Sequence, residues 1–314
     1  MSGQGSGGPG GALAAPSVNQ ALWMTVGVLA ISTSPILVRV AAMPALALAF
    51  WRCLAGAAVL APFASRRQVG WLDRAELARL AASGVFLAVH FALWNASLAL
   101  TTVAAATTLV SSAPLFVGLG SVFLGEPPSG RAWAGIALAT AGAVVIGAGD
   151  AIMGGSVGGV RGGASGPTGG SPLLGDVLAF AGALAMAAYL LLGRVARRRL
   201  PVSTYAASVY GVAAVVLLPA SLLTGASLGG YEATAWLALA GVVVGPQLLG
   251  HTVFNSLLAS VSASLVAVVM LLEPVIATVL AWWLFGELPG PSLWAGAPMV
   301  LTGVWLATTG SRRM

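Results

Sequence analysis

The sequence predicts an all-helical integral membrane protein with ten transmembrane helices, arranged as two inverted repeats of five. Three observations lead to this prediction: the composition, a series of apolar runs and an internal repeat. The 314-residue chain is 58% apolar and only 7% charged, with a mean hydropathy of +0.96. Soluble domains carry about 25% charged residues, so these few charges cannot cover a water-facing surface. We therefore expect lipid to surround most of the protein.

Ten apolar runs approach the ~20 residues that a helix needs to cross a bilayer. Open sheets cannot lie in lipid because their edge groups would lack hydrogen-bond partners, so we expect the runs to be helices. The expected spans are residues 19–38, 44–64, 77–99, 103–124, 132–149, 174–193, 203–223, 234–256, 262–285 and 292–310.

The spans divide into two groups of five, separated by a segment rich in glycine and serine. Such a composition is typical of a flexible linker. The expected organisation is a disordered tail at 1–18, a first repeat at 19–149, a linker at 150–173, a second repeat at 174–310 and a tail at 311–314.

The arginines predict the orientation. If the N-terminus is inside, the outer loops hold only Arg39 and Arg161, and Arg52 lies within a span. This positive-inside distribution predicts an inner-membrane protein with both termini in the cytoplasm. It also accounts for the net charge of +6 without a nucleic-acid partner. The inner arginines are Arg66, Arg67, Arg74, Arg79, Arg131, Arg194, Arg197, Arg198, Arg199, Arg312 and Arg313.

The two halves repeat the same spacings. Asn95 precedes Pro114 by 19 residues, and Asn255 precedes Pro274 by the same number. A glutamate precedes a Trp-Ala-Gly by seven residues in each half, and a second glycine follows (Glu126, Trp133, Gly135 and Gly142; Glu287, Trp294, Gly296 and Gly303). Because each repeat has an odd number of spans, the second must be inverted, which predicts a binding site at mid-depth between the halves.

Two segments carry a family resemblance, 95–146 with SSAPLFVGLGSVFLGE and WAGIALATAG, and 255–306 with LLEPVIATVLAWWLFGE and WAGAPMVLTGVWLA. They resemble the EamA-type carriers of the drug/metabolite transporter superfamily. The resemblance implies that spans 1–4 and 6–9 surround a central cavity, with spans 5 and 10 at the periphery. It also implies a substrate among amino acids, other metabolites or drugs.

Two charges lie near the middle of spans, Arg52 and Glu273. A charge in hydrocarbon costs at least about 2.5–3.5 kcal/mol, so each needs a partner or a function. Glu273 stands where the first repeat has Ala113 and thus has no symmetric counterpart. Two interpretations stay open: a proton or cation site, or a structural group that pairs with Arg52 or binds backbone freed by Pro274.

A polar cluster is expected on one wall of the cavity. Gln247 and His251 are four residues apart and share a helix face. Gln247 and Glu273 are each thirteen residues from Ser260, where we expect a turn, so antiparallel neighbours would place them level. His90 lies at a comparable depth in the first half. Packing is the alternative role for each histidine, and no third ligand at metal-site spacing predicts a metal centre.

The first half contributes hydroxyls and aromatics. Thr108 and Ser112 are four residues apart, next to Ser111 and just ahead of Pro114. Trp94 follows His90 by four residues, and Tyr189 in the sixth span is a further candidate for the cavity wall. Because serine and threonine in membrane helices also bond backbone, packing is the alternative.

The function that follows is secondary transport, not catalysis. The expected substrate is a small amino acid-like, neutral or cationic amphiphile, moved across the inner membrane by alternating access, with export as the direction. No GxxxxGK[ST] loop is present for ATP, and no cofactor is expected, although Glu273 would allow proton coupling. The alternatives are a membrane sensor or assembly protein, and an intramembrane enzyme using His251 and Glu273. The repeat glycines predict close helix contact or, alternatively, a homodimer.

Overall fold

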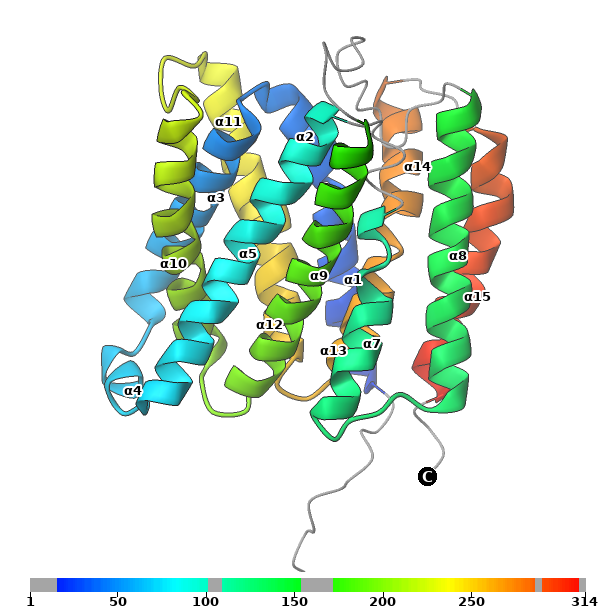
Figure 1. The fold of residues 1–314 in the computed structure, drawn as a ribbon, viewed down its shortest axis with the longest axis horizontal. Coiled ribbons are helices and arrows are strands. Elements are labelled where there is room, and N and C mark those ends of the chain that lie inside the picture. Colours follow the sequence, from blue (N-terminus) through cyan, green and yellow to red (C-terminus); the bar gives the residue numbers. More distant parts are fainter. Residues whose placement is uncertain (1–15, 101–108, 154–171, 286–289, 311–314) are drawn as a thin grey trace, which may run out of the picture.

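The computed structural model describes residues 16–100, 109–153, 172–285 and 290–310, and every regular element within them is helical (Figure 1). Seven helical segments in this part of the chain are long and apolar enough to cross a membrane, and residues 113–123 and 130–146 form two shorter apolar helices. The helices stand side by side in one bundle, as the composition predicts.

The first half contains α1 (Val18–Ser32), α2 (Ser34–Ala41), α3 (Ala45–Leu60), η1 (Ala61–Phe63), α4 (Arg66–Gly70), α5 (Arg74–Leu100), α7 (Ala113–Phe123) and α8 (Gly130–Met153). The second half contains α9 (Pro172–Ala196), α10 (Val202–Leu223), α11 (Ala233–Val242), η3 (Val243–Thr252), α12 (Val253–Leu257), α13 (Ala263–Met270), α14 (Glu273–Phe285) and α15 (Pro291–Gly310).

Three of the expected spans are interrupted where we expected continuous helices. The breaks fall at Thr33 in span 19–38, at 111–112 in span 103–124 and at 271–272 in span 262–285. Each break stands directly before a helix whose first turn contains a proline. Proline lacks a backbone N–H and is favoured at a helix start, so the chain ends one helix and begins another there. The second and third breaks occupy equivalent places in the two repeats.

The expected span 234–256 is also not a regular α-helix. Its centre, η3, is a π-helix that contains Pro246. The Thr252 hydroxyl donates to the Gln247 carbonyl at 3.0 Å, five residues back, which matches the wider turn. Segments of π-helix are rare and are frequent at functional sites.

Glycines bring α8 and α15 into backbone contact along one edge of the bundle (Figure 1). A Cβ atom on Gly135 would lie 2.5 Å from the Gly303 carbonyl oxygen, and one on Gly142 would lie 2.7 Å from that of Gly296. The later glycine of α8 meets the earlier glycine of α15, so the two helices are antiparallel. The repeat glycines therefore pack the two halves together within one chain.

One end of the bundle gathers most of the described arginines, and we call it the arginine-rich end. It comprises residues 66–79, the α7–α8 connection and residues 194–199. Arg199 at the end of α9 forms an ion pair with Glu76 at the start of α5. The start of α1 lies at the same end, because Gln20 donates to the Ser260 hydroxyl at 2.8 Å in the α12–α13 turn, and so does the end of α15 (Figure 1).

Candidate functional site

A hydrogen bond between the side chains of Arg52 and Gln247 joins the two halves of the chain. The Arg52 Nε donates to the Gln247 Oε1 at 2.8 Å, and the guanidinium carbon lies 4.7 Å from the centre of the Phe91 ring. Arg52 is only 5% exposed and Gln247 is fully buried. Arg52 is near the midpoint of α3 and Gln247 is near that of 233–257, so the bond lies at mid-depth.

The close approach of η3 to α3 depends on Gly56. A Cβ atom at this position would lie 3.0 Å from the Gln247 Cγ and 3.2 Å from the Tyr210 Cδ2. A bare glycine therefore leaves the space in which the Gln247 side chain extends toward Arg52. The sequence indicated Arg52 and Gln247 as separate candidates, and their spacing gave no sign that the two side chains bond each other.

Both histidines lie close to the Phe91 ring. The Phe91 ring centre is 5.4 Å from that of His90 and 6.0 Å from that of His251. The His90 Nδ1 is 2.9 Å from the Gly182 carbonyl oxygen on α9. His90 thus has a packing contact with the second half.

Glu273 is the first residue of α14, directly after the break at 271–272. Arg52 and Glu273 are within electrostatic range of each other. Among the residues that the structure describes, however, Arg52 forms no direct ion pair with Glu273, and Gln247 forms no hydrogen bond with it. The start of a helix carries partial positive charge, which favours a carboxylate there.

A chain of hydrogen bonds leads from Tyr189 toward η3. The Tyr189 hydroxyl donates to the Asn255 Oδ1 at 2.6 Å, and the Asn255 Nδ2 donates to the Tyr210 hydroxyl at 3.4 Å. The Tyr210 hydroxyl is 3.0 Å from that of Thr252. Sequence reasoning selected Tyr189 but missed Phe91, Tyr210 and Thr252, and it used Asn255 only as a marker of the repeat.

The hydroxyls ahead of Pro114 contribute differently. The Ser112 hydroxyl donates to the Leu109 carbonyl at 2.6 Å within its own helix turn, as packing serines do. Ser111 is 8% exposed, and Thr108 lies outside the described residues. Trp94 is on α5, one turn after Phe91.

Three nitrogen donors near mid-depth are buried with no acceptor among the described residues: Arg52 Nη2, Gln247 Nε2 and Trp94 Nε1. An unsatisfied buried donor costs about 1–3 kcal/mol, and a charged one costs more. Two of the three belong to the side chains that bond each other. A ligand with acceptor atoms would remove this cost, so this place has the chemistry of a binding site.

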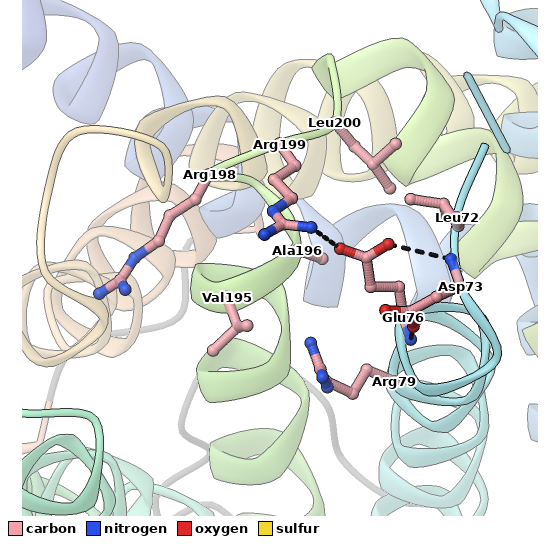
Figure 2. Close-up of a pocket in the computed structure, with 9 residues that line it drawn as sticks. All are labelled: Leu72, Asp73, Glu76, Arg79, Val195, Ala196, Arg198, Arg199 and Leu200. Carbon is pink, nitrogen blue, oxygen red and sulfur yellow. Dashed lines mark hydrogen bonds and ion pairs between the residues drawn. The ribbon is translucent and has the colours of Figure 1, made fainter.

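The arginine-rich end contains a separate cavity of about 340 Å³, formed between α5 and α9 (Figure 2). Glu76 stands within it, and its Oε2 accepts from the Asp73 backbone N–H at 3.1 Å. The cavity is distant from the mid-depth cluster and shares no residue with it. It is lined by Leu72, Asp73, Glu76, Arg79, Val195, Ala196, Arg198, Arg199 and Leu200.

A largely buried ion pair between Arg194 and Glu126 lies at the same end. Arg194, at the end of α9, donates to both carboxylate oxygens of Glu126 and, through Nη1, to the Leu258 carbonyl at 2.7 Å. Burial acts to raise the pKa of Glu126, but the hydrogen bonds and charges of Arg194 and Arg198 outweigh it and lower the pKa below its ordinary value.

Comparisons with known proteins agree with this architecture. A family model, the EamA-like transporter family, matches residues 19–148 and 173–309. One solved crystal structure shares the fold with a TM-score of 0.76 at 22% sequence identity, and the match covers 95% of this chain and 99% of that one. No curated protein matches closely enough to name a substrate. The two matched segments cover most of the chain in two repeats, and the chain belongs to the EamA-like transporter family, as a multi-pass membrane protein.

Proposed function

We propose that the protein is a secondary transporter that moves a small metabolite across the inner membrane by alternating access. The observation that carries this proposal is the Arg52–Gln247 bond, which joins the two halves at mid-depth. Transporters built from repeats bind substrate at this depth, between the halves and beside interrupted helices. Interrupted helices are present here in both halves, before Pro114 and before Pro274.

An inverted relation between the halves supports the same proposal. Under the repeat spacing, Gly135 corresponds to Gly296 and Gly142 to Gly303. The contact of Gly135 with Gly303 then corresponds to the contact of Gly296 with Gly142, and both are formed. Exchanging the two halves therefore leaves the α8–α15 crossing unchanged. A two-fold axis in the membrane plane would produce this symmetry.

The arginine-rich end supports an orientation with both termini in the cytoplasm, by the positive-inside rule. The ten-span topology proposed from the sequence places this end inside. Export is the direction we propose, by analogy with the family. In this structure the Glu126–Arg194 pair and the Leu258 contact of Arg194 hold elements of the two halves together at this end.

Locking the inner end tests alternating access. Gln20 and Ser260 belong to different halves and touch at the inner end, so we would replace both with cysteine in a Cys53→Ala background. Proteoliposomes would be assayed for exchange of labelled amino acids, nucleobases and polyamines before and after treatment with a bifunctional thiol reagent. We expect treatment to abolish exchange, and cleavage of the cross-link to restore it.

The matched control is a cysteine pair at Ser227 and Tyr231, which lie within one half and contact each other there. Cross-linking this pair leaves exchange unchanged under the proposal. Exchange that survives a complete Gln20–Ser260 cross-link would contradict alternating access, and a folded protein that exchanges none of the compounds would favour a sensor.

A further inference from the structure

The unpaired groups around Arg52 have a chemical preference that narrows the substrate class, on the assumption that the protein is the transporter proposed above. Arginine and the amide nitrogen of glutamine are donors only. Their buried free atoms, Arg52 Nη2 and Gln247 Nε2, therefore require acceptors and cannot bind another donor. A ligand group with two acceptor oxygens fits this requirement.

The orientation of the Gln247 amide is fixed by its partner. Because Arg52 Nε can only donate, the amide atom that lies 2.8 Å from it must be the oxygen. The Gln247 NH₂ group is then the other branch of the same amide, while the amide oxygen accepts from the guanidinium. The Phe91 ring, 4.7 Å from the guanidinium carbon, restrains the guanidinium further.

Charge balance argues for a carboxylate that belongs to the ligand. Arg52 is buried at mid-depth, and no carboxylate in the described part of the chain bonds it. An uncompensated charge in hydrocarbon is costly and marks a functional place. Hydrogen bonds from a guanidinium to a carboxylate are charge-assisted and stronger than those between neutral groups, so a carboxylate is the acceptor that best suits the free Nη2 of Arg52.

Glu273 supplies the opposite charge in the same region, within electrostatic range of Arg52 but not bonded to it. A cationic amphiphile would satisfy Glu273 and be repelled by Arg52, whereas a multiply charged anion would meet only one arginine and a carboxylate. A ligand with one positive and one negative group can satisfy both residues.

We propose that Arg52 and Gln247 form the subsite for the carboxylate of a small zwitterionic substrate, whose ammonium group lies toward Glu273. The Arg52 Nη2 and the Gln247 Nε2 donate to the carboxylate oxygens. This assignment narrows the neutral, zwitterionic or cationic substrates compatible with the sequence to zwitterions.

The test uses four related compounds on the purified full-length protein. An apolar amino acid such as leucine carries both charges, leucinamide and isoamylamine lack the carboxylate, and N-acetylleucine lacks the ammonium group. The same set is repeated with phenylalanine and its derivatives, so that the result covers an aliphatic and an aromatic side chain. Binding is measured by thermal shift and by competition in proteoliposome exchange.

We expect the amino acid to bind and each compound that lacks one charged group to bind at least roughly 10-fold more weakly, as expected for loss of a hydrogen bond to a charged group. Arg52→Gln should weaken binding of the amino acid by roughly 10- to 100-fold and leave the residual binding of the amine unchanged.

Gln247→Glu keeps the size of the side chain and places a carboxylate beside Arg52. We expect this variant to retain its thermal stability without ligand and to lose amino acid binding, because its own carboxylate occupies the subsite. Measuring both properties in this variant distinguishes a loss of substrate binding from a loss of folding. Thr140→Val is the matched control, since it removes another buried unpaired donor, on α8, and should leave binding unchanged.

Two results would overturn the assignment. If the amide and amine bind as tightly as the amino acid, and Arg52→Gln weakens all of them equally, the carboxylate subsite is wrong although transport stands. If folded protein binds no zwitterion but exchanges another compound of the broader panel, the zwitterion proposal fails while the proposed function holds. Absence of any exchange in that panel contradicts the transporter itself.

Discussion

Arg194 donates to the Glu126 carboxylate through two of its three guanidinium nitrogens, with Nε at 3.0 and 3.1 Å from the two oxygens and Nη2 at 2.9 Å from one of them. The two residues are 68 positions apart in the sequence and belong to different halves. Their side chains are only 5% and 12% exposed. Because Arg194 also bonds the Leu258 carbonyl, one guanidinium ties the α7–α8 connection, the end of α9 and the α12–α13 turn together.

Glu126→Gln should destabilise the protein by about 1.5–3 kcal/mol, the usual contribution of a hydrogen bond to a charged group. The substitution removes the negative charge and leaves the buried Arg194 bonded chiefly to Leu258. Thermal unfolding in detergent measures the change. Glu232→Gln is the matched control, because Glu232 is exposed and makes no cap bond; an equal loss in both variants would contradict this role for Glu126.

The stabilisation by Glu126 should also depend on pH. Its folded pKa is below the ordinary value of 4.5, so folding favours the ionised form. A group of this kind stabilises above its unfolded pKa, and the stabilisation is lost as pH falls through the folded pKa. We therefore expect the difference in stability between the native protein and Glu126→Gln to be constant near neutral pH and to shrink only below about pH 4.5. A difference that shrinks already between pH 8 and 6 would show that another group is responsible.

Gly303→Ala should destabilise the α8–α15 contact. The added Cβ would lie 2.4 Å from the Ala139 backbone nitrogen and 2.6 Å from the Gly135 carbonyl oxygen, and backbone atoms cannot move aside as a flexible side chain can. Overpacking of this kind typically costs 1–3 kcal/mol. Gly211→Ala, in α10, is the control, because a Cβ there meets nothing within 4 Å. Retained folded yield and unchanged thermal stability in Gly303→Ala would contradict the packing described.

Glu273→Gln should abolish transport driven by a proton gradient and retain exchange of substrate between two sides at equal pH, if Glu273 is the coupling group. The amide cannot release a proton, yet it keeps the size of the side chain at the start of α14. Proteoliposomes with and without a pH gradient separate the two activities. Thr278→Val is the control on the same helix, where the native hydroxyl donates to the Pro274 carbonyl. Loss of both activities in folded protein would refute the coupling role.

Much of the architecture could be predicted because lipid imposes simple rules on the sequence. The apolar runs predicted where helices lie, and the arginines predicted which loops gather at one end. The breaks at 111–112 and 271–272 could not be placed from hydropathy, because the residues on both sides are equally apolar. Pro114 and Pro274 were the available signals for them, although proline is also tolerated within membrane helices.

The site was only partly predictable, because the sequence reveals buried charges but not which side chains they contact. Burial cost identified Arg52 and Glu273, since charges in lipid need an explanation. The Arg52–Gln247 contact depends on the wider turn of η3 and on the missing side chain of Gly56, and neither leaves a periodic signal. The ion pair between Glu126 and Arg194 could not be predicted either. The repeat shows which residues occupy equivalent positions in the two halves, but it does not show which residues touch each other.

The crossing of α8 and α15 also constrains how the two halves can move. Gly135 and Gly142 are seven residues apart, so the backbones touch at two points about 10 Å from each other at 1.5 Å per residue. Two contacts at different heights restrain rotation of α8 against α15 as well as their separation. If the halves rock as proposed, we expect them to stay together along this edge, so that displacement grows with distance from it. Because α3 and α10 stand on the far side of the bundle from α8 and α15 (Figure 1), the groups around Arg52 would then move further than the groups at this edge.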